Sequence, residues 1–77
     1  MERVSMPLNA VGMGASAEVD NIVGGEIICK KLMEMGFSKG AIIQVVKNDS
    51  GALIVKVGGT KLVVARGMAQ KVMMREI

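Results

Sequence analysis

The 77-residue sequence contains no histidine, tryptophan or tyrosine, and it has a single phenylalanine and a single cysteine. Without histidine, the chain lacks the side chain best suited to proton transfer near neutral pH, and it lacks imidazole as a metal ligand. Cys29 cannot form an internal disulfide and has no second cysteine or histidine with which to bind a metal. The composition therefore predicts a protein that is not an enzyme and that has no cofactor and no metal site.

Long apolar runs are also missing. The longest, Ala52 to Val55 and Leu62 to Ala65, span four residues each, whereas a helix needs about 20 to cross a bilayer. The first seven residues, MERVSMP, do not show the charged-then-apolar order of a secretory signal. We therefore expect no membrane span and a cytoplasmic location.

What the sequence does contain is typical of a small globular domain. About half of its residues (51%) are apolar and 22% are charged, as in folded chains of ordinary composition. Eight methionines supply much of the apolar volume. We expect one domain over residues 1–77, with a small core.

One helix is predicted over residues 26–35. Ile28, Leu32 and Met35 lie at helical spacing, and Cys29 and Met33 widen this apolar stripe. Gly36 follows as the residue that can adopt the left-handed conformation common after a helix.

The remaining pattern predicts a mainly β fold. Residues 6–16 suit irregular chain with a short strand at most, residues 17–23 alternate as a strand does, and residues 41–65 indicate three successive strands. A short helical turn over residues 66–70 and a last strand over residues 71–77 complete the chain. About five short strands and one amphipathic helix are best accommodated in a small SH3-like barrel, with the helix at one opening.

Two turns set the register of the three central strands. Gly58-Gly59 forms a type I′ hairpin loop, which pairs Val55 with Leu62 and Leu53 with Val64 on the inner face. The outer face then pairs Ile54 with Val63 and Lys56 with Lys61. A three-residue loop, Asp49-Ser50-Gly51, pairs Val46 with Ile54, Val45 with Val55 and Asn48 with Ala52.

This register predicts an apolar row next to a basic row on the outer face. The apolar row holds Val46, Ile54 and Val63, with Ile42 as an extension, and the next row holds Gln44, Lys56 and Lys61. Contiguous exposed valine and isoleucine need a cover, which is either the chain's own helix or terminal segment, or a partner. Our candidate partner-binding residues are Val46, Ile54, Lys56, Lys61 and Val63.

The sequence offers two other kinds of candidate site. Glu18, Asp20 and Glu34 could offer oxygen ligands to a hard cation, but their spacing is not that of a metal site, and a solvated strand edge explains them better. The net charge of +3 and the isoelectric point near 9.4 make a small nucleic-acid-binding barrel the alternative function. A single phenylalanine is a weak basis for the stacking surface that single-stranded nucleic acids need.

The segment Leu32-Met33-Glu34-Met35-Gly36-Phe37-Ser38-Lys39-Gly40, with the glycine and apolar spacing that follows it, resembles the FeoA family, the ferrous iron transport protein A domain. The similarity runs from Met6 to the C-terminus, and Lys39 stands where the family commonly has proline. The resemblance implies an SH3-like module that assists a GTPase-linked membrane transporter of ferrous iron by direct contact with the transporter's cytoplasmic domain. It would then meet the membrane only through that transporter.

Overall fold

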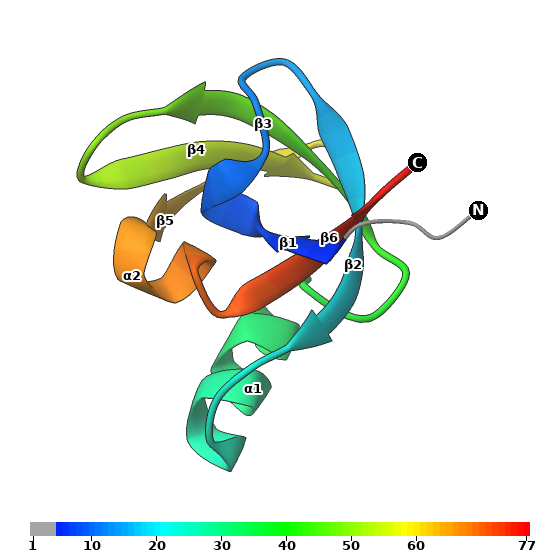
Figure 1. Ribbon diagram of the computed structural model, residues 1–77. Coiled ribbons are helices and arrows are strands. Elements are labelled where there is room, and N and C mark those ends of the chain that lie inside the picture. The colour runs from blue at the N-terminus through cyan, green and yellow to red at the C-terminus, as the bar shows by residue number, and fades with distance from the viewer. Residues whose placement is uncertain (1–4) are drawn as a thin grey trace.

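The computed structural model describes residues 5–77. Within these residues the elements follow one another as β1 (Ser5–Pro7), η1 (Leu8–Ala10), β2 (Ser16–Ile22), α1 (Glu26–Glu34), β3 (Ile42–Asn48), β4 (Ala52–Val57), β5 (Thr60–Ala65), α2 (Arg66–Ala69) and β6 (Val72–Glu76). The strands form one antiparallel sheet in the order β1-β6-β2-β3-β4-β5. The sheet curls into a small barrel that stays open between its two edge strands, β1 and β5 (Figure 1).

The mainly β barrel predicted from the sequence is confirmed, and it has one strand more than the five expected. The additional strand is β1, whose residues pair with β6. Three residues are too few to show a period of two, so the alternation that indicates a strand could not appear there.

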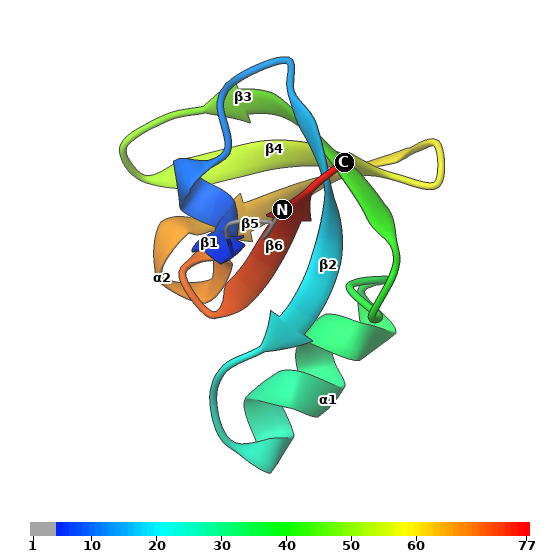
Figure 2. The ribbon, with the colours of Figure 1, turned by 45° about the vertical axis from the view of Figure 1, so that its right-hand side comes forward.

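Helix α1 lies at one end of the barrel, beyond the last residues of β2 (Figures 1 and 2). Its inner edge is the predicted stripe, with Leu32 fully buried and Ile28 half-buried. The prediction that Met33 widens this stripe is wrong, because its side chain is 55% exposed. The helix rests on the end of the barrel along one edge, so most of its circumference faces solvent.

The turn after α1 requires glycine. Gly36 has φ +103°, a conformation that strains any residue with a Cβ atom. A Cβ atom at this position would also lie 2.9 Å from Cγ1 of Val57. The glycine thus ends the helix, as predicted, and lets the following residue, Phe37, enter the core with no exposed surface.

The core collects the inward side chains of β2 to β6 together with residues from η1, α2 and the α1 end of the barrel. Its largest fully buried members are Phe37, Leu8, Leu32, Ile43, Leu53, Met74, Val19, Val45, Val55, Val64 and Val72. The predicted inward positions of Leu53, Val55 and Val64 are therefore confirmed, and Leu62 is half-buried next to them at the edge of the sheet.

The register between β4 and β5 is the one predicted. Val57 pairs with Thr60, Lys56 with Lys61 and Ile54 with Val63, and both hairpin glycines have positive φ, +56° at Gly58 and +87° at Gly59. These values are those of a type I′ turn. In Figure 2 this hairpin projects from the barrel as the yellow loop.

The register between β3 and β4 is only partly the one predicted. Val45 pairs with Val55 as expected, but a bulge at Val46 then shifts the strand, so that Ile54 lies opposite Lys47. The predicted pairing of Val46 with Ile54 is wrong for this reason. The pairing of Asn48 with Ala52 is wrong as well, because Asn48 pairs with Leu53.

The hydrogen bonds of Asn48 account for the bulge. Its Nδ2 donates to the backbone oxygen of Asn9 at 3.0 Å and of Val11 at 3.4 Å. Its Oδ1 accepts from Nη1 of Arg66 at the start of α2. One extra residue in β3 turns this amide towards η1 and α2, which lie together (Figure 1), and there it satisfies two backbone carbonyls of the loop.

Candidate functional site

The outward side chains of the β3–β4–β5 sheet form the candidate site, which we call the lysine face. It consists of Gln44, Ile54, Lys56, Lys61 and Val63. The register places Gln44, Lys56 and Lys61 side by side in one row, and Ile54 beside Val63 in the adjacent row. Four of the five predicted partner-binding residues are thus brought together, all on the β4–β5 hairpin.

The fifth predicted residue, Val46, is not part of this face. It is half-buried at the bulge, and Lys47 takes its place opposite Ile54. Lys47 forms an exposed ion pair with Asp49, Nζ to Oδ2 3.7 Å, and such pairs hold their partners only weakly. Ile42, expected to extend the apolar row, pairs instead with Glu18 of β2 and is exposed.

Nothing in the described part of the chain covers the middle of the lysine face. Val63 is 68% exposed, so neither α1 nor a segment of residues 5–77 packs over it. Ile54 beside it is half-buried. Within residues 5–77 the structure therefore leaves this apolar pair without the internal cover that the sequence left open.

The two lysines face each other across the hairpin without compensation. Lys56 and Lys61 are both exposed and directly opposite, and no residue from 5 to 77 forms an ion pair with either of them. Like charges directly opposite in an antiparallel pair are unfavourable. The lysine face therefore combines a small apolar centre with two ammonium groups that have no counter-ion among residues 5–77.

The acidic residues considered as cation ligands are engaged elsewhere. Arg75 of β6 donates from Nη2 to Oδ1 of Asp20, and its Nε lies 3.9 Å from Oε1 of Glu18. The guanidinium bridges the two carboxylates and offsets one of their two negative charges. Glu34 lies apart on α1, and residues 5–77 contain no group of three side chains that could hold a metal ion.

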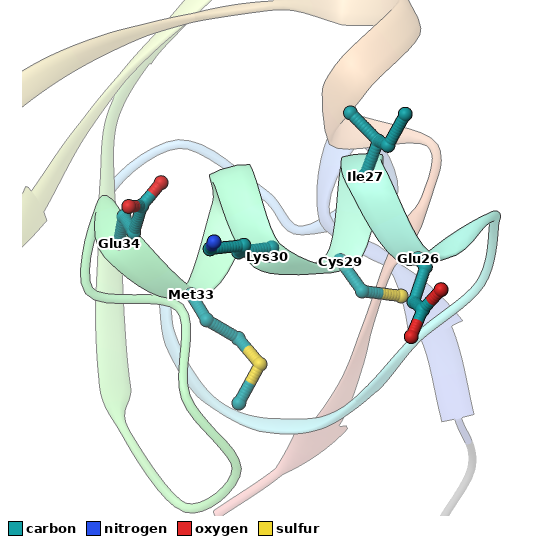
Figure 3. A pocket seen from close by; sticks show the side chains of 6 residues that line it. All are labelled: Glu26, Ile27, Cys29, Lys30, Met33 and Glu34. Atoms are coloured by element: carbon teal, nitrogen blue, oxygen red, sulfur yellow. The ribbon is translucent and has the colours of Figure 1, made fainter.

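A second surface feature, not predicted from the sequence, is a shallow hollow of about 680 Å³ along α1. Its described lining consists of Glu26, Ile27, Cys29, Lys30, Met33 and Glu34, all side chains of one helix, as Figure 3 shows. Ile27 is 83% exposed and lies on the side of the helix away from Cys29 and Met33 (Figure 3). In the sequence, Ile27 lies outside the Ile28 stripe and on the same helix face as Lys30 and Glu34. This spacing could have indicated an exposed apolar residue.

Comparison with known proteins identifies the kind of domain. The family model of the FeoA domain matches residues 6–76. A protein of Methanocaldococcus jannaschii, provisionally named Fe(2+) transport protein A, is 29% identical over 70 residues, which are 91% of this chain and 85% of that protein. The crystal structure of an iron uptake regulatory protein, FeoA, superimposes with a TM-score of 0.89 at 38% identity, over 96% of this chain and 99% of the other.

Two further structures confirm the SH3-like fold. The zinc complex of Stenotrophomonas maltophilia FeoA, described as a prokaryotic SH3 domain protein and as a candidate ferrous iron transport activating factor, has a TM-score of 0.79 at 27% identity, over 90% of this chain and 88% of that one. A manganese-dependent transcriptional repressor shares the fold alone, with a TM-score of 0.88 at 15% identity, over all of this chain and 44% of its own. No helix within residues 5–77 has the length and apolar character needed to cross a bilayer.

Proposed function

The chain belongs to the FeoA family, and we propose that it is a cytoplasmic accessory module of ferrous iron transport that acts by binding the transporter. The lysine face is the contact surface in this proposal, and an acidic surface of the transporter's cytoplasmic GTPase domain is its partner. The names of the relatives, Fe(2+) transport protein A and FeoA, support the link to ferrous iron transport. Ferrous iron is the cargo of the transporter and is not bound by this surface.

The observation that carries the proposal is the pair of facing lysines beside exposed Val63. Lys56 and Lys61 repel each other across the hairpin, and carboxylates on a partner would relieve that repulsion. Val63 and Ile54 supply the apolar contact that a protein interface needs at its centre. The lysines then steer association and fix its orientation, as charges at the rim of interfaces do.

The chemistry of the lysine face suits recognition rather than catalysis. It presents ammonium, amide and aliphatic groups, none of which serves as a nucleophile or general base without a special environment. We therefore propose that the chain is not an enzyme and that any effect on GTP hydrolysis is exerted through the partner.

Nucleic-acid binding, the alternative from the charge of the chain, receives less support. Phe37 is the single aromatic residue of the sequence, and it has no exposed surface. Base stacking on aromatic side chains, a principal source of affinity for single strands, is therefore not offered by the surface.

A matched pair of charge reversals tests the proposal. Lys56→Glu with Lys61→Glu changes the lysine face, and Lys31→Glu with Lys39→Glu makes the same change in net charge at two exposed lysines outside it. Binding of each variant to the soluble GTPase domain of the cognate transporter is measured by calorimetry. We expect the first variant to bind at least about tenfold more weakly and the control to bind like the unmodified chain.

Either of two results would reject the lysine face as the contact surface. One is unchanged binding after reversal of Lys56 and Lys61. The other is an equal loss in both variants, which would indicate a response to net charge alone. Binding that weakens steeply with salt, and equally to nucleic acid, would favour the alternative function.

A further inference from the structure

Strand β5 is an edge strand with one side unpaired. In the sheet order it is the last strand and pairs with β4 alone, and no backbone group of another element within residues 5–77 bonds to its free side. An unpaired edge exposes a row of N–H and C=O groups that can pair with another chain.

The hairpin geometry tells which backbone groups face outward. In a two-residue type I′ hairpin the residues next to the loop, Val57 and Thr60, form a hydrogen-bonded pair, and such pairs alternate with non-bonded ones along the strands. Leu62 and Val64 therefore bond to β4. The backbone N–H and C=O groups of Lys61 and Val63 point away from β4, towards the free side.

This edge lacks the protection that the opposite edge has. Strand β1 is three residues long, contains Pro7 and leads directly into η1, three features that discourage pairing with another chain. Strand β5, with the sequence TKLVVA, has six residues, no proline and one charge, that of Lys61. The side chains beside its free backbone groups are those of the lysine face, including exposed Val63.

The charges decide between two occupants of this edge. A second copy of the chain, paired antiparallel through β5 with Val63 opposite Val63, would place Lys61 opposite Ala65 and leave every lysine of the two hairpins uncompensated. An extended segment with a carboxylate opposite Lys61 and a branched apolar residue opposite Val63 would satisfy both the charges and the exposed side chain.

We propose that β5 binds an extended acidic segment of the partner as an added strand of the sheet. The backbone of Lys61 and Val63 supplies the hydrogen bonds, and the lysine face selects the side chains of the incoming strand. This inference rests on the proposed function for the identity of the partner. It adds the mode of recognition, which is the addition of a strand that bonds to the backbone of Lys61 and Val63.

Amide hydrogen exchange, followed by NMR, tests the mode directly. In the free chain we expect fast exchange at the amides of Lys61 and Val63 and slow exchange at those of Leu62 and Val64, which bond to β4. Addition of the transporter's soluble GTPase domain should slow exchange at Lys61 and Val63 by about tenfold or more, because a new ladder forms there.

The outcomes separate the two proposals. Binding that leaves the Lys61 and Val63 amides in fast exchange would overturn strand addition and leave the lysine face as a contact surface. No binding of the domain would overturn both. Protection of these amides in the chain alone, rising with its concentration, would show that a second copy occupies the edge and would overturn the acidic segment.

A substitution at Val63 gives an independent test. Val63→Pro removes an amide that faces the free side, so the hydrogen bonds to β4 remain, whereas Val63→Thr keeps the amide and the branched shape. We expect the proline variant to bind the domain at least about tenfold more weakly than the threonine variant. Equal binding by the two folded variants would overturn the proposal, and if the proline variant does not fold, exchange in the unmodified chain decides.

Discussion

Reversal of one charge in the facing lysine pair should stabilise the protein. Lys56 and Lys61 form a non-hydrogen-bonded pair, the type in which opposite side chains lie closest, with Cβ atoms about 4.5–5.5 Å apart. Lys61→Glu replaces a repulsion by an attraction, and each of the two is worth a few tenths of a kcal/mol to about 1 kcal/mol. The sum, about 1 kcal/mol, corresponds to a rise in Tm of about 4–8 °C for a domain of this size.

Thermal unfolding followed by circular dichroism at low salt, about 0.01 M, measures this gain. At 1 M salt, where the Debye length is about 3 Å, most of the gain should disappear. Lys61→Gln removes only the repulsion and should give about half of the effect. Lys56→Glu with Lys61→Glu restores a like-charged pair and should unfold near the temperature of the unmodified chain.

The same Lys61→Glu variant should bind the transporter's domain more weakly, because the carboxylate faces the acidic partner. A variant that is more stable and binds less would indicate that the lysine pair serves binding at a cost to the stability of the fold. If Lys61→Glu were no more stable than Lys61→Gln, or if its gain persisted at 1 M salt, the electrostatic account of the hairpin would be refuted.

Three further predictions concern the fold that positions the hairpin. Gly36→Ala should lower the free energy of unfolding in urea by about 1–3 kcal/mol, because of the positive φ at this position and the contact of the added Cβ atom with Val57. A double-mutant cycle with Val57→Ala should show favourable coupling, and strict additivity would exclude the contact as a cause. Asn48→Ala should lower the free energy of unfolding by about 1–3 kcal/mol, because two loop carbonyls lose their hydrogen-bond donor. Asn48→Asp should be destabilised as well, since a carboxylate cannot donate to these carbonyls. Full stability of either variant would contradict the role of these hydrogen bonds. Phe37→Ala should lower the free energy of unfolding by about 3–5 kcal/mol, and a variant with an unchanged urea midpoint would contradict the packing of this ring in the core.

The sequence predicted those parts of the structure that local chemistry determines. Two adjacent glycines at Gly58 and Gly59 specify one turn type, and that turn alone fixes the register of β4 and β5 and the arrangement of Ile54, Lys56, Lys61 and Val63. The end of α1 was predictable for the same reason, because glycine is the residue that tolerates the φ found there.

What could not be predicted depends on residues far apart in the chain. The bulge at Val46 is coupled to the hydrogen bonds of Asn48 with Asn9 and Val11, and nothing in the local pattern of β3 indicates these distant acceptors. One inserted residue changes the neighbours of every side chain beyond it. For this reason Val46 is not part of the lysine face, although the sequence predicted it there. The exposure of Met33 likewise depends on how little of α1 the barrel end covers.

The most direct test of the lysine face is an NMR titration of the isotope-labelled chain with the transporter's soluble GTPase domain, with and without nucleotide. The account predicts that the resonances of Ile54, Lys56, Lys61 and Val63 shift together, and that Lys56→Glu with Lys61→Glu abolishes these shifts. Shifts confined to α1 and its hollow, or to residues outside the β4–β5 hairpin, would contradict it.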